Sequence, residues 1–142
     1  MSQEMMLHEI FPVGAGEFGT AGEASGKIKS ILKKLGVDSG VVRRVSVAAY
    51  EVELNLVIHS LGGEMELIVR PSRVELNIRD IGPGIPDLEK ALTEGFSTAS
   101  DDVRMMGFGA GMGLPNMKRN ASTFDIKSEV GVGTTIEMGF DL

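Results

Sequence analysis

The sequence of 142 residues has no cysteine, no apolar run long enough to cross a membrane and no excess of basic residues. Without cysteine, the chain forms neither a disulfide framework nor a thiolate metal site. Its 14 basic and 20 acidic residues give a formal net charge of −6, whereas a protein that coats nucleic acid needs a basic surface. We therefore expect no direct nucleic-acid partner, although this balance leaves room for a small local basic site.

The first ten residues, "MSQEMMLHEI", lack the basic and apolar regions of a secretory signal peptide. With no apolar membrane span either, the sequence predicts a cytoplasmic protein without membrane contact. The length and a hydrophobic content of 42% suit one compact domain, spanning residues 1–142, with its own core.

Hydrophobic periodicity and turn residues divide the chain into short elements. They predict an edge strand at 8–13, a basic helix at about 24–36 ended by Gly36, a helix at about 39–60 capped by Asp38 or Ser39, a hairpin of 64–70 and 73–80, a helix at about 113–121, and a hairpin of 123–130 and 134–140. This order predicts an α/β (α+β) two-layer sandwich: a mixed, mostly antiparallel sheet with helices on one face.

The segment between the first hairpin and the third helix has no regular pattern over about 25 residues. Such a long loop inside a compact domain is usually functional. We predict that residues 85–108, approximately, form a lid.

The second predicted helix carries two stripes. The apolar stripe recurs at spacings of three and four, as expected for a helix that packs on a core, and consists of Val41, Val45, Ala48, Val52 and Leu56. Beside it, Glu51, Asn55 and His59 lie four residues apart and so nearly above one another. The polar stripe is either the solvated side of an amphipathic helix or a functional set with a general base and a Mg²⁺ ligand.

Two glycine-containing segments follow strand or loop patterns. In "RDIGPGIPD", Asp80 with Gly82 and Gly84 is either a plain turn or an acidic acceptor beside bare backbone where a flat ligand binds. In "GFGAGMGLPN" (107–116), alternate glycines precede a helix. They form either an anion site, where free N–H groups and the helix dipole favour phosphate, or a flexible hinge.

The order of these motifs is more informative than any one of them. E-x3-N-x3-H on a helix, D-x-G-x-G after a hairpin, a lid, G-x-G-x-G and "GVGTT" together resemble the GHKL ATPase superfamily, which includes gyrase, histidine-kinase and mismatch-repair ATPases. Within it, "DIGPGIPDLEKALTEGFSTAS" and "GFGAGMGLPNMKR" are most similar to bacterial anti-sigma-factor serine kinases and stress-switch kinases. The resemblance is specific over about 40–142 and weak over 1–39.

The resemblance implies a role for each matching position. Glu51 matches the general base that deprotonates the attacking hydroxyl, Asn55 matches the Mg²⁺ ligand, and His59 matches a third position that is structural or close to the phosphates. Asp80 matches the acceptor of the adenine amino group, and Thr134 supports the adenine side.

Further ligand contacts are implied by the same resemblance. Gly82 and Gly84 would let the adenine lie flat, the phosphates would be wrapped by Gly109, Gly111, Met112, Gly113 and Leu114, and Ser97, Thr98 and Arg104 belong to the lid, with Arg104 the candidate for a γ-phosphate contact.

The implied function is an ATP- and Mg²⁺-dependent serine/threonine protein kinase. It would phosphorylate and bind a small STAS-type antagonist and have a sigma factor or a phosphatase as a second partner. The alternatives are a non-catalytic nucleotide-sensing module, a detached histidine-kinase catalytic domain and an ATPase alone. Both a monomer and a homodimer fit the resemblance.

Overall fold

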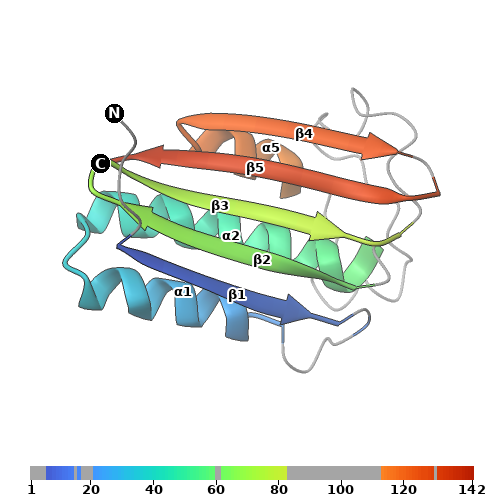
Figure 1. Ribbon diagram of the computed structural model, residues 1–142, viewed down its shortest axis with the longest axis horizontal. Coiled ribbons are helices and arrows are strands. Elements are labelled where there is room, and N and C mark those ends of the chain that lie inside the picture. Colours follow the sequence, from blue (N-terminus) through green and yellow to red (C-terminus); the bar gives the residue numbers. More distant parts are fainter. Residues whose placement is uncertain (1–5, 15, 17–20, 60–61, 83–112, 130) are drawn as a thin grey trace.

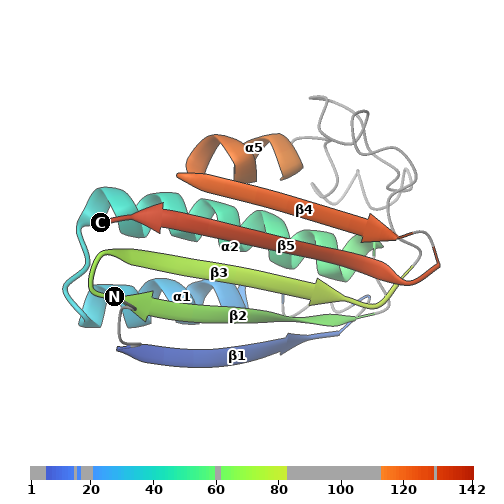
Figure 2. The same cartoon turned by 45° about the horizontal axis from the view of Figure 1, so that its top comes forward.

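The computed structural model describes residues 6–14, 16, 21–59, 62–82, 113–129 and 131–142, without the side chains of residues 58 and 59. Along the chain the elements are β1 (Leu7–Val13), α1 (Glu23–Lys34), α2 (Ser39–His59), β2 (Gly63–Arg70), β3 (Arg73–Asp80), α5 (Gly113–Asn120), β4 (Thr123–Glu129) and β5 (Gly133–Asp141). The sheet order is β1-β2-β3-β5-β4, and each of the four pairings is antiparallel. The three described helices lie across one face of the sheet (Figures 1 and 2), which confirms the predicted fold class.

The element boundaries agree with the sequence to within about two residues. Strand β1 is an edge strand as predicted, and Asp38 accepts a hydrogen bond from the N–H of Gly40 at the start of α2 (3.0 Å). Helix α1 ends at Lys34, two residues before Gly36, whose φ of 76° suits glycine at this position. In the part of the chain that the structure describes, no helix is long and apolar enough to span a membrane.

Helix α2 lies between α1 and α5 and packs against both (Figure 1). All five residues of its predicted apolar stripe are buried and belong to the core. Opposite them, the sheet contributes Leu67, Leu76 and Phe140, each with no exposed surface. Burying a side chain of this size contributes about 1.5–3 kcal/mol, so this layer fixes how α2 is rotated about its axis.

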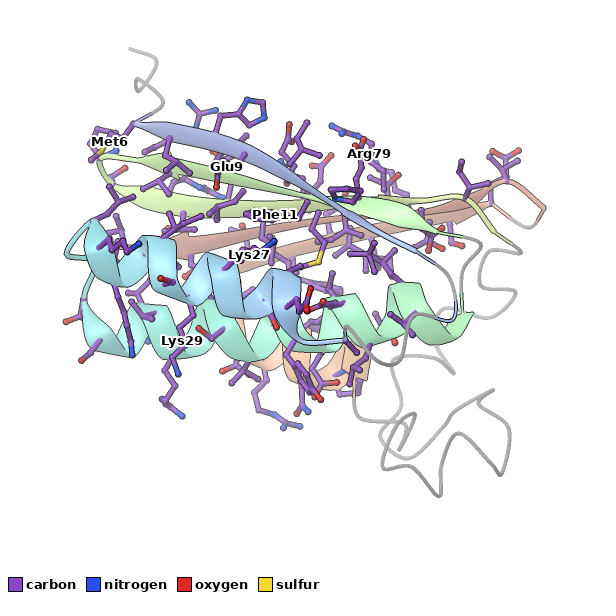
Figure 3. All side chains as sticks on the ribbon, turned by 90° about the horizontal axis from the view of Figure 1, so that it is seen from below. Met6, Glu9, Phe11, Lys27, Lys29 and Arg79 are labelled. Atoms are coloured by element: carbon purple, nitrogen blue, oxygen red, sulfur yellow. The ribbon has the colours of Figure 1, made fainter. Side chains whose placement is uncertain are left out.

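The face of the sheet opposite the described helices carries a polar network, as is common for an antiparallel sheet with one solvated face. Glu66 accepts a hydrogen bond from Asn77 (3.2 Å), contacts His8 (2.8 Å) and lies 3.6 Å from the guanidinium of Arg79. Figure 3 shows Arg79 on this face, away from the helices.

A buried carboxylate joins α2 to the start of α1. The oxygens of Glu53 accept hydrogen bonds from the N–H groups of Ala24 (3.1 Å) and Ser25 (3.0 Å), and only 3% of Glu53 is exposed. The residue preceding α1 is Gly22, which has no side chain to cap the helix. Glu53, which lies 28 positions after Ser25, therefore supplies the N-terminal cap.

We predict that Glu53→Gln lowers the free energy of unfolding by about 2 kcal/mol, because the amide group turns a donor toward one of the two helix N–H groups. Urea denaturation measures the change. Glu23→Gln, which removes an exposed carboxylate from the first turn of the same helix, should cost less than about 1 kcal/mol. Equal losses in the two variants would mean that general helix–charge attraction, and not this cap, is responsible.

Candidate functional site

The site begins at the end of β3, where Asp80 is held by the neighbouring strand. One carboxylate oxygen, Oδ1, accepts a 2.7 Å hydrogen bond from the N–H of Thr134 in β5. This bond lies just beyond the last paired positions of the two strands, Arg79 and Thr135. Two residues that the sequence motifs place 54 positions apart are thus brought into direct contact.

Gly133 makes this contact possible, and the sequence analysis did not single it out. A Cβ at this position would lie 2.2 Å from the backbone oxygen of Asp80 and 3.1 Å from its Oδ1, and the φ of Gly133 is 150°. No side chain fits here without moving the backbone of Asp80. Gly133 lies within the "GVGTT" motif, but the sequence analysis drew a role from that motif for Thr134 only.

A second hydrogen bond fixes the side chain of Thr134. Its hydroxyl lies 2.9 Å from the hydroxyl of Ser128 on β4, and Thr134 is only 7% exposed. Thr134 therefore bonds to Asp80 through its N–H group, and its hydroxyl is bonded to Ser128 on the neighbouring strand. Ser128 was not predicted, because nothing in the local pattern of β4 distinguishes it from other polar strand positions.

The environment of Asp80 raises the pKa of its carboxyl group. Burial is the larger influence and disfavours the charged form, and the hydrogen bond from Thr134 only partly opposes it. Within the described residues, no hydrogen bond to the second oxygen, Oδ2, is recorded. Asp80 is therefore a partly desolvated acceptor with room for one more donor, a property that fits the amino group of a purine base.

The C-terminal half of α2 lies over this end of β3. A Cβ at Gly63 would come within 2.9 Å of both the Cα of Asp80 and a methyl group of Leu56. The half-buried Asn55 precedes Leu56 on the same helical turn. Asp80 and the polar stripe of α2 therefore belong to the same end of the molecule.

Glu51 lies one turn earlier on α2 and is held by α5. Its Oε1 accepts a hydrogen bond from the Nδ2 of Asn116 (3.2 Å), while Arg119 donates to the Oδ1 of Asn116 (3.1 Å). The bond from Arg119 orients the amide so that its NH₂ group points at Glu51. Asn116 was missed as a site residue although it lies within the quoted "LPNMKR" segment, because only the packing of α5 on α2 places it here.

The described residues do not form a metal site by themselves. They contain no cluster of three or more His, Cys, Asp or Glu side chains that could hold an ion. Asn55 offers a carboxamide oxygen, and within the described chain no hydrogen bond to it is recorded. This donor set fits Mg²⁺, which is commonly held by few protein oxygens together with substrate phosphates and water.

Several predicted residues cannot be placed. Gly84, Ser97, Thr98, Arg104, Gly109, Gly111 and Met112 lie outside the described residues, as do the lid at 85–108 and the side chain of His59. Gly82 is buried and its N–H donates to Val132 (3.3 Å). Gly113 begins α5, and the side chain of Leu114 is part of the core, so that a ligand contact at Leu114 would come from its backbone.

We predict that Asp80→Asn raises the free energy of unfolding near neutral pH, by less than about 1 kcal/mol since the group is only half-buried. The folded protein holds the proton of Asp80 more readily than the unfolded chain, so this group contributes stability at low pH that is lost as the pH rises through its raised pKa. Urea unfolding over a pH series measures the difference, which should vanish in acid. Asp125→Asn, at an exposed position on β4, should have no effect; a less stable Asp80→Asn protein at neutral pH would contradict the prediction.

Comparison with known proteins shows which family the chain matches. The family model described as "Histidine kinase-, DNA gyrase B-, and HSP90-like ATPase" matches residues 40–142. The serine/threonine-protein kinase RsbT of Bacillus subtilis is 32% identical over 113 residues, covering 77% of this chain and 79% of that protein. The anti-sigma F factor of Geobacillus stearothermophilus is 26% identical over 115 residues, covering 77% and 75%.

The anti-sigma F factor of Geobacillus kaustophilus is 30% identical over 98 residues, covering 65% of this chain and 64% of that protein. The family match begins at the start of α2 and includes both Glu51 and the Asp80–Thr134 contact. The chain therefore belongs to the histidine kinase-, DNA gyrase B- and HSP90-like ATPase family.

Proposed function

We propose that the protein is an ATP-dependent serine/threonine protein kinase of the anti-sigma regulatory type. The observation that carries the proposal is the setting of Glu51. Its carboxylate is held by a neutral amide, and no ion pair to it is recorded in the described part of the chain. A carboxylate that is positioned but not neutralised is suited to act as a general base.

The Asp80 cluster supports ATP as the nucleotide. In this proposal the Oδ2 of Asp80 accepts a hydrogen bond from the adenine amino group, Gly82 and Gly84 leave space for the ring, and Thr134 supports it. The phosphates extend toward the start of α5, where helix N–H groups favour an anion. The phosphates would be contacted there by Gly109, Gly111, Met112, Gly113 and Leu114. Further contacts would come from the lid residues Ser97, Thr98 and Arg104.

Asn55 would hold Mg²⁺ with the phosphate oxygens, and His59 would lie close to them. When bound, the ion would neutralise part of the phosphate charge. Charge neutralisation and the positioning of the reacting groups account for most of the catalysis of phosphoryl transfer. Glu51 accepts the proton of the serine or threonine hydroxyl as the oxygen bonds to the γ-phosphorus and ADP leaves. Asn116 keeps Glu51 in place for this step.

The names of the relatives support a regulatory setting. One is a serine/threonine-protein kinase and others are anti-sigma factors. We extend this to a small STAS-type antagonist as the phosphorylated partner, with a sigma factor or a phosphatase as a second partner. A nucleotide-sensing module without catalysis would not need Glu51 to be positioned.

The first experiment is an ATP titration with and without Mg²⁺, followed by calorimetry, on the wild type and Asp80→Asn. We expect Mg²⁺-dependent binding that weakens at least about tenfold in the variant, because a buried acceptor of the adenine amino group is replaced. The ratio of the affinities for ATP and GTP should also become smaller in this variant. Asp125→Asn is the control and should bind as the wild type does; unchanged affinity of Asp80→Asn would refute the assignment of the adenine site.

The catalytic step is tested with Glu51→Gln. Transfer of labelled phosphate from ATP to the STAS-domain proteins encoded by the same genome should fall at least about 100-fold, because the base is lost. ATP affinity should change little, since the residue faces the acceptor. Glu64→Gln, on the sheet face opposite the described helices, is the matched control. An unchanged transfer rate in Glu51→Gln would show that another group takes the proton.

A further inference from the structure

A groove runs along the outer side of the helical layer, between α1 and α2, and shares only Glu51 with the proposed catalytic site. It has a volume of about 730 Å³. On α2 its lining follows a single stripe with helical spacing, opposite the stripe that faces the sheet, and consists of Ser39, Val42, Arg43, Ser46, Val47, Tyr50 and Glu51. On α1 it is lined by Lys29 and Lys33.

The groove is basic in a protein that is acidic as a whole. Lys29, Lys33 and Arg43 are all exposed, and in the described part of the chain no ion pair or hydrogen bond is recorded for any of them. Figure 3 shows Lys29 on the side of the helices that faces away from the sheet. The segment 23–59 contains six of the 14 basic residues but only four of the 20 acidic ones. This face therefore attracts a partner of negative charge.

The floor of the groove is apolar, and its shape favours a chain segment over a small ligand. Val37 and Val42 line one end, and at the other end Tyr50, 41% exposed, packs over Gly22, where a Cβ would lie 3.5 Å from its ring. The lining on α2 runs from Ser39 to Glu51, and these 12 residue steps correspond to about 18 Å at the helical rise. That length accommodates roughly five residues of extended chain.

The groove ends at Glu51, the residue that also contacts α5. We propose that the groove is the docking site for the phosphoacceptor protein, and that it binds an acidic, partly apolar segment of that protein whose serine or threonine reaches Glu51. This inference rests on the proposed kinase function and adds the chemistry by which the acceptor is recognised. Arg43 precedes Glu51 by eight residues, or about 12 Å along α2, so the acidic residues should lie about three to six residues from the phosphorylated one.

The test uses the absence of cysteine in the chain. Ser39→Cys, at the exposed far end of the groove, gives a unique attachment point for an environment-sensitive fluorophore. Ser30→Cys, exposed on α1 outside the groove, is the labelling control. The probes are two synthetic peptides with a central serine, leucines, and either glutamates or lysines three to six residues from the serine. Binding is titrated without ATP, and phosphate transfer is measured separately.

Charge reversal supplies a matched pair of variants. Lys29→Glu/Lys33→Glu reverses two groove cations, and Lys27→Glu/Lys34→Glu reverses two exposed lysines of the same helix outside the lining. Both change the net charge equally. We expect the glutamate peptide to change the fluorescence of the label at position 39 but not at position 30. At low ionic strength, its affinity should fall at least about tenfold in Lys29→Glu/Lys33→Glu and less than about twofold in Lys27→Glu/Lys34→Glu.

Three results would overturn the docking site: no response at position 39, equal losses in the two double variants, or equal binding of the lysine peptide. Binding with the expected variant pattern but without phosphate transfer to any acceptor would support the groove and refute the kinase function. Transfer that Lys29→Glu/Lys33→Glu leaves unchanged would support the kinase and refute the groove.

Discussion

The burial of one apolar stripe of α2 against the sheet determines where every other residue of that helix lies. With five stripe residues in the core, the remaining positions have no rotational freedom. Successive residues are about 100° apart, so Glu51 and Glu53, two positions apart, lie on opposite flanks of the helix. Glu53 therefore meets the start of α1 and Glu51 meets α5. The same rotation turns Tyr50 outward to the groove.

The carboxylates of Glu53 and Asp80 differ in how completely their oxygens are hydrogen-bonded. Glu53 is almost fully buried, but both of its oxygens accept bonds from helix N–H groups, so its burial is compensated. Among the described residues only one oxygen of Asp80 is hydrogen-bonded, and burial raises the pKa of its carboxyl group. A polar group that the fold leaves incompletely bonded is the kind of group that a ligand completes.

The proposed nucleotide site and the basic groove meet at Glu51. On one side lie the end of β3, with Asp80, and the C-terminal half of α2, with Asn55. On the other side lie the cations of α1 and the outer stripe of α2. The chain has a net charge of −6, so most of its surface would repel an acidic partner. The basic groove is therefore the favourable place for such a partner to approach.

The periodicity of apolar residues and the positions of glycine, proline and aspartate suffice to predict the helices, the two hairpins, the apolar stripe of α2 and the fold class, because these depend on neighbours within a few residues. The motif order likewise indicates Glu51, Asn55 and Asp80. Glu53, Asn116, Ser128 and Gly133 are different: their roles depend on contacts with other elements. Asn116 and Glu51 are separated by 65 positions, and Gly133 is needed only because the backbone of Asp80 lies against it. Such roles come from packing between distant segments, which no local pattern encodes.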